Sequence, residues 1–163
     1  MKAALPLKVA DQVWIATAQL HRNRPEAVDF AIEQILKQAI ELNDEEPLRP
    51  GVYVHAIQHC VANRAPNPGR YRMLYETGEG RRRLYRKGDP FHPDRADSKV
   101  VPERDDIPFE FHELLIWYES WSESNSETSA KSDPLLRLQG SGKELWADEP
   151  ADEYIERLRE GWQ

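Results

Sequence analysis

Residues 70–89, RYRMLYETGEGRRRLYRKGD, constrain the fold more than any other part of the sequence. Two short runs of apolar and basic residues flank TGEG, a glycine-containing turn sequence. Short apolar runs on either side of such a turn are typical of a β-hairpin. The segment therefore predicts a hairpin whose strands carry an unusual density of arginine.

Three segments before the hairpin, and one after it, have the apolar periodicity of amphipathic helices. They cover residues 8–22, 29–42, 52–63 and 109–121, and Asp29 is a plausible N-cap for the second. A proline-rich, charged loop precedes the fourth helix. The apolar positions are Val9, Val13, Trp14, Thr17 and Leu20; Ile32, Ile35, Leu36, Ala39 and Ile40; Val54, Ile57 and Val61; and Phe111, Leu114, Leu115, Tyr118 and Trp121.

This order of elements predicts an α+β fold, a winged helix-turn-helix domain over residues 1–121. It would consist of three helices, a basic β-hairpin wing and a fourth helix. In winged domains that bind DNA, the third helix enters the major groove and the wing contacts the backbone or the minor groove.

The charge distribution points to the same region. The whole chain has a net charge of -7, yet residues 49–87 contain nine basic and two acidic residues, or +7. From Glu119 to the end, eleven acidic residues face five basic ones, or -6. Such asymmetry predicts one region that faces a polyanion and a separate acidic region.

DNA binding is therefore the predicted role of the third helix and the hairpin. Gln58, Asn63 and Arg49 could read base edges, and the arginines at 81–83 would neutralise phosphates at the tip of the wing. Two other interpretations of a basic hairpin stay open: a solvated surface, or a winged helix that binds protein. The predicted DNA-binding residues are Arg49, Tyr53, His55, Gln58, His59, Asn63, Arg64, Arg70, Arg72, Arg81, Arg82, Arg83, Arg86 and Lys87.

No group of residues indicates an enzyme, a metal site or a cofactor. His55 and His59 share a helical face and could bind zinc with a third ligand, but the chain lacks the Glu of a His-Glu-x-x-His helix and paired cysteines. A polar pair that faces DNA is the favoured interpretation. Cys60 is expected to be buried. The sequence has one cysteine, no apolar leader and no run long enough to span a membrane, and these features together predict a cytoplasmic protein.

The end of the chain has a different character. Residues 122–134 have the composition of a flexible linker, and residues 135–163 form a short tail with a helix predicted at about 149–160. Gly140-Ser141-Gly142-Lys143 is not a phosphate-binding loop, because the first glycine position holds Arg137 and Glu144 replaces the required hydroxyl residue. The glycines are better interpreted as a hinge before aromatic residues that suit a groove on a partner protein.

The tail, LLRLQGSGKELWADEPADEYIERLREGWQ, resembles the toxin-binding tails of bacterial type II antitoxins of the VapB type, which neutralise PIN-domain ribonucleases. The resemblance covers the last 29 residues and implies an antitoxin that also represses its own operon, as a homodimer on operator DNA. VapB antitoxins more often carry a different DNA-binding domain. The implied toxin-binding residues are Lys143, Leu145, Trp146, Tyr154, Ile155, Arg157, Leu158, Arg159 and Trp162.

Two alternatives remain from the sequence. One is a stand-alone winged-helix transcriptional regulator whose tail mediates dimerisation or packs internally. The other is a pure interaction protein whose winged helix binds another protein instead of DNA.

Overall fold

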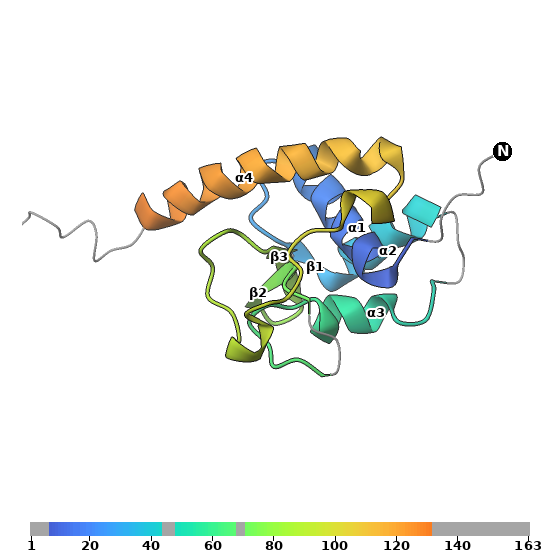
Figure 1. The fold of residues 1–163 in the computed structure, drawn as a ribbon, viewed down its shortest axis with the longest axis horizontal. Helices are drawn as coiled ribbons and strands as arrows, with labels where there is room; N and C mark the ends of the chain where they lie inside the picture. The colour runs from blue at the N-terminus through green and yellow to red at the C-terminus, as the bar shows by residue number, and fades with distance from the viewer. Residues whose placement is uncertain (1–6, 44–47, 68–70, 132–163) are drawn as a thin grey trace, which may run out of the picture. The chain divides into compact units, whose positions relative to one another are not determined.

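The computed structural model describes residues 7–43, 48–67 and 71–131 (Figure 1). The chain divides into two units, Met1–Ser126 and Glu127–Gln163, and the fold described here is that of the first. It combines helices with a small antiparallel sheet, which confirms the predicted α+β class. The described segments contain no helix long and apolar enough to cross a membrane.

The elements are, in chain order, α1 (Val9–Asn23), β1 (Phe30–Ala31), α2 (Ile32–Asn43), α3 (Val52–Val54), the π-helical turn η1 (His55–His59), β2 (Leu74–Gly78), β3 (Arg81–Leu84), the 3-10 turns η2 (Pro93–Arg95), η3 (Arg104–Asp106) and η4 (Phe109–Phe111), and α4 (His112–Lys131).

Helix α1 is the centre of the core. It is buried on every face from Ala10 to Ala18, because α2, α3, η1 and β3 all pack against it. Helix α4 lies on the other side of α1 from α3 (Figure 1), where the Tyr118 ring meets the Trp14 ring edge-on at 5.7 Å. The buried polar groups of α1 have backbone partners: Gln12 Nε2 donates to the Ala39 carbonyl and Thr17 Oγ1 to the Val13 carbonyl.

Strand β1 is an element that helical periodicity did not predict. Phe30 and Ala31 pair antiparallel with Arg82 and Arg81 of β3, so the sheet has the order β1-β3-β2. The predicted second helix therefore begins at Ile32 instead of at residue 29. Asp29 does not cap it; the Gln34 side chain accepts a hydrogen bond from the Ala31 amide instead.

The third helix is shorter than the predicted span of 52–63. It ends at His59, where the Cys60 amide donates to the His55 carbonyl in a wide π-helical turn. Its buried face is Val52, Ala56 and Cys60, whereas Val54 is 40% exposed, so the predicted apolar stripe is wrong at Val54. Its other members, Ile57 and Val61, are partly and fully buried. Small side chains at positions 56 and 60 fit against α1, and this steric fit decides which face is buried.

The hairpin is confirmed, with shorter strands than the sequence suggested. Leu74 opposes Leu84, Tyr75 opposes Arg83 and Glu76 opposes Arg82, and the pairing is irregular between Glu76 and Gly78. Gly80 has a φ of 67°, a left-handed conformation that glycine adopts without strain. Both strands anchor to the core through leucines 74 and 84, which are fully buried.

Helix α4 runs to Lys131, into the segment whose composition predicted a flexible linker from residue 122. Ser122 is buried, and its hydroxyl accepts a hydrogen bond from the Lys87 amide. Asn125 Nδ2 donates to the Trp121 carbonyl, so polar side chains in this part bond within the fold and the helix. The predicted tail, residues 135–163, lies outside the described residues.

Candidate nucleic-acid interface

Arg82 occupies the middle of the arginine run and is buried. Its side chain is 2% exposed, and its guanidinium donates to the carbonyls of Ala56 at 3.3 Å and Arg81 at 2.7 Å. Glu76 Oε1 lies 3.4 Å away. Burial lowers the pKa of Arg82, and the Glu76 carboxylate opposes that shift. Arg82 thus ties the hairpin to η1, contrary to the prediction that it meets a phosphate.

Arg83 is also enclosed. Its side chain is 8% exposed and makes a two-bond ion pair with Asp89, at 2.6 and 2.9 Å. Its guanidinium lies 4.4 Å above the centre of the Tyr75 ring. The planar ion pair and the ring contact together hold the chain that leaves β3, which is a structural role.

Arg81, the first arginine of the run, is half exposed. Its side chain is 48% exposed, and its Nε donates to Asp29 Oδ1 at 2.6 Å. Thr77 Oγ1 donates to the other oxygen of Asp29 at 2.7 Å. The turn of the hairpin is therefore linked to the residue that precedes β1, and Arg81 keeps an accessible positive charge there.

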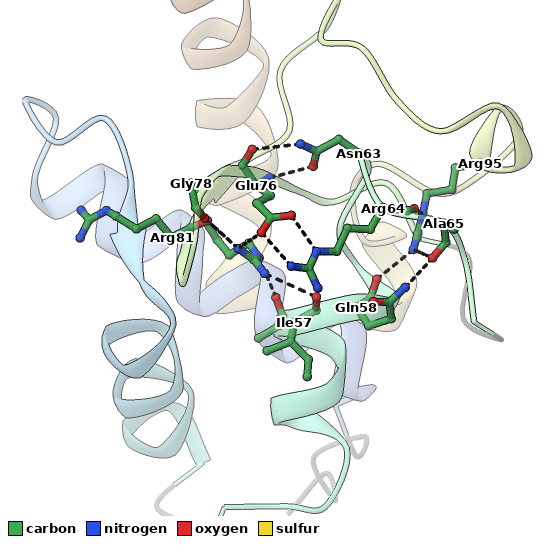
Figure 2. Close-up of polar contacts among 11 residues, drawn as sticks. Ile57, Gln58, Asn63, Arg64, Ala65, Glu76, Gly78, Arg81 and Arg95 are labelled. Carbon is green, nitrogen blue, oxygen red and sulfur yellow. Dashed lines mark hydrogen bonds and ion pairs between the residues drawn. The ribbon is translucent and has the colours of Figure 1, made fainter.

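Arg64 and Glu76 form a second ion pair beside η1. Two nitrogens of Arg64 donate to the two oxygens of Glu76 at 2.7 and 2.8 Å, and the side chain of Arg64 is 40% exposed. Hydrogen bonds from Arg64, aided by the charge of Arg82, lower the pKa of Glu76. The Asn63 amide exchanges two 2.9 Å hydrogen bonds with the backbone of Glu76 (Figure 2). This exchange fixes the position of the carboxylate independently of its charge.

Arg95 has the most enclosed charge of the site, and no motif in the sequence pointed to it. It is 0% exposed, lies in η2, and donates to the carbonyls of Gln58, His59 and Arg64 at 2.7 to 2.9 Å. It also donates to the Tyr71 carbonyl at 2.5 Å. All these acceptors are backbone oxygens, and two belong to the last residues of η1. A cation at this end of a helical turn offsets the partial negative charge of its unpaired carbonyls.

The other predicted basic residues are spread over several environments. Arg49 is part-buried and donates to the Gln12 side chain and the Leu7 carbonyl. Arg72 and Arg86 lie over aromatic rings, at 4.2 Å from the Phe91 centroid and 5.2 Å from the Trp121 centroid. Lys87 is exposed, and Arg70 lies outside the described residues.

The exposed side of α3 and η1 is short of positive charge. Tyr53 is 53% exposed, and the sequence VYVHAIQH contains neither lysine nor arginine. The Gln58 side chain donates to the Ala65 carbonyl, so its amide is already engaged.

The two histidines of η1 lie together, with ring centres 4.8 Å apart. His55 Nδ1 is 2.9 Å from the Gly51 carbonyl. Burial, together with His55 and Arg95, lowers the pKa of His59. Nowhere in residues 7–43, 48–67 and 71–131 do three or more His, Cys, Asp or Glu side chains gather as a metal site would need. Cys60 is fully buried, as expected, and burial raises the pKa of its thiol.

The structure thus brings together part of the predicted set. Tyr53, Asn63, Arg64 and Arg81 keep accessible atoms on α3, in the loop after η1 and on the hairpin, whereas Arg82, Arg83 and Arg95 hold these segments in place. All predicted toxin-binding residues lie outside the described part of the chain. Comparisons with known protein families, with curated proteins and with solved structures find no match for this chain.

Proposed function

We propose that the chain is an antitoxin with two functional parts. The N-terminal part is a winged-helix domain that binds operator DNA and represses the protein's own operon. The C-terminal 29 residues bind and neutralise a PIN-domain ribonuclease. The tail's role rests on its sequence resemblance to VapB-type antitoxins.

The path of the chain supports the winged-helix part of the proposal. A short strand between the first two helices joins the hairpin to give the order β1-β3-β2, and the third helix precedes that hairpin in the chain. This connection places α3 and η1 beside the hairpin on the side of α1 away from α4 (Figure 1). A helix and a wing on one side of a domain can contact a groove and its flanking backbone together.

Phosphate binding would come from arginines that exchange partners. Arg64 and Arg81 are each half exposed and paired with one carboxylate, and a DNA phosphate likewise offers two oxygens that can accept a pair of hydrogen bonds from a guanidinium. Exposed ion pairs contribute only about 0–1 kcal/mol, so such an exchange costs little. Tyr53 is an exposed side chain on this helix that could touch base edges, whereas the Asn63 amide, like that of Gln58, is already engaged within the protein.

The test compares Arg81→Ala with Arg22→Ala. Both side chains are 48% exposed and both pair with one carboxylate, but Arg22 binds Glu113 of α4 and lies away from the hairpin. Binding to duplex DNA from the protein's own promoter is measured by fluorescence anisotropy over a range of salt concentrations. Arg81→Ala should weaken binding and reduce the salt slope by about 1, whereas Arg22→Ala should leave both unchanged. Equal slopes for the two variants would refute the proposed interface.

The tail is tested by truncation. A chain ending at Ser132 should retain DNA binding but no longer rescue growth when a PIN-domain ribonuclease encoded next to it is expressed. Replacing Trp146 and Trp162 by alanine in the full chain should weaken toxin binding in the same way. Rescue by the truncated chain would show that the tail does not neutralise the toxin.

One observation favours a protein-binding role as the second candidate. Tyr53 and Val54 are exposed on a helix without basic residues, and most arginines around it are already paired. A protein partner would use such an apolar, uncharged face, whereas DNA would use phosphate contacts. Absence of salt-dependent binding to any duplex DNA would favour this candidate over the first.

A further inference from the structure

A groove whose lining includes none of Tyr53, Asn63, Arg64 and Arg81 has no part in the function described above. It lies between the chain that follows β3, residues 100–102 and the first turns of α4, and its volume is about 620 Å³. Sites for small organic molecules commonly have volumes of about 300–1,000 Å³. The groove therefore has the size of a ligand site.

Arg72 lines this groove in an arrangement that leaves hydrogen-bonding capacity unused. Its guanidinium is held over the Phe91 ring at 4.2 Å and the Tyr85 ring at 5.2 Å, and it donates to the Ala96 carbonyl at 3.1 Å. Its Nε is buried and has no acceptor within the described residues. Buried donors normally have a partner, and a planar guanidinium fixed by ring contacts is well suited to a carboxylate.

The remaining walls are mainly apolar. Val100, Val101 and Leu115 line the groove, together with the rings of Tyr85 and Tyr118. The Tyr118 hydroxyl donates to the Tyr85 carbonyl and is thus engaged within the protein. These walls suit a hydrocarbon or aromatic body.

The charged residues around the groove favour a ligand with a single negative charge. Lys87 lines it and is exposed, and adds a second cation to Arg72. Glu119 and Glu123 of α4 line it as well, so a ligand with several negative charges, such as a nucleotide, would be repelled. One carboxylate near Arg72 and Lys87 satisfies both observations.

We propose that this groove binds a small organic acid with one carboxylate and an apolar body. The carboxylate accepts hydrogen bonds from Arg72 and is attracted by Lys87, while the body packs against Val100, Val101 and Leu115. This inference does not depend on the antitoxin assignment.

The test uses the full chain and three matched probes: 4-phenylbutyrate, 4-phenylbutanamide and 4-phenylbutylamine. Titrations are followed by the methyl NMR signals of Val100, Val101 and Leu115. The carboxylate should shift these signals and bind at least tenfold more tightly than the amide, and the amine should not bind. Equal affinities, preference for the amine, or shifts confined to other methyl groups would overturn the proposal.

Two variants connect the preference to the proposed cations. Arg72→Gln should abolish the tenfold preference for the carboxylate, whereas Arg24→Gln, an exposed residue outside the groove, should leave it unchanged. If Arg72→Gln does not fold, Lys87→Gln serves instead, because its side chain is exposed, and it should reduce the preference at least threefold. An unchanged preference in either folded variant would refute the assignment.

Discussion

Replacing Arg95 by methionine should destabilise the domain more than any substitution of an exposed arginine. Methionine keeps an unbranched apolar stem but removes every donor to the carbonyls of Gln58, His59, Arg64 and Tyr71. A hydrogen bond to a charged group contributes about 1.5–3 kcal/mol. Part of this loss is offset, because the substitution also removes the cost of burying a charged guanidinium. The same burial lowers the pKa of Arg95 in the folded protein.

The net loss should be about 3–5 kcal/mol, because several buried carbonyls lose their donor and each unsatisfied buried group costs about 1–3 kcal/mol, less the recovered desolvation cost. With a urea dependence of about 2 kcal/mol per molar, a loss of 4 kcal/mol moves the unfolding midpoint down by about 2 M. Typical domains have only about 5–15 kcal/mol of stability, so the variant should be near its limit at 37 °C. Urea unfolding followed by tryptophan fluorescence measures the midpoint.

Arg24→Met is the matched control, because Arg24 is exposed and the same chemical change should alter stability by less than about 0.5 kcal/mol. Hydrogen exchange locates the effect: the Tyr71 amide, which donates to the His59 carbonyl at 3.0 Å, should exchange faster in Arg95→Met. A loss below about 1 kcal/mol would refute the reasoning, because it would mean that the freed carbonyls find other donors at little cost.

Two further predictions follow from buried and paired charges. Burial, with Arg86 and Arg83 nearby, lowers the pKa of His21 to about 3, and its Nε2 accepts a hydrogen bond from the Leu84 amide. Because an unfolded histidine titrates near pH 6.5, the unfolded state binds a proton as the pH falls below 6.5, while His21 in the folded state stays neutral. The free energy of unfolding is therefore unaffected by this histidine above about pH 6.5 and falls by about 2 kcal/mol between pH 6.5 and pH 5. Urea midpoints at pH 8 and pH 5 should differ more in the wild type than in His21→Gln, and an equal difference would contradict the assignment. Glu76→Gln should remove the ion pair that Arg64 must break to reach a phosphate, so it should lower stability by about 1 kcal/mol and tighten DNA binding by up to about fivefold, measured by urea unfolding and anisotropy. An affinity that stays unchanged would show that Arg64 does not contact phosphate.

Local periodicity was sufficient to predict the helices that have one continuous apolar face and the hairpin with its glycine turn. It was not sufficient for β1, because two residues carry no periodic pattern and the strand exists only through its pairing with β3. It also ended α4 too early. Serine and asparagine favour linkers on average, but here Ser122 is buried against the chain that follows β3.

The charge map located the basic region but could not assign a role to each arginine. Neighbouring side chains in a strand point to opposite faces, and whether each face is covered depends on segments far away in the sequence. Arg82 is covered by η1, and Arg83 by Tyr75 and Asp89, while Arg81 stays half exposed beside Asp29.

By itself, the sequence determined the order of helices, the basic hairpin and the buried state of Cys60, because these depend on hydrophobic patterning and turn chemistry along short segments. The tertiary structure decided that Val52 instead of Val54 faces the core, that Arg95 closes the loop after η1, and that two of the three arginines at 81–83 are structural. Burial and hydrogen-bond partners come from contacts between distant segments. The sequence alone does not show whether an arginine faces solvent or a set of carbonyl oxygens.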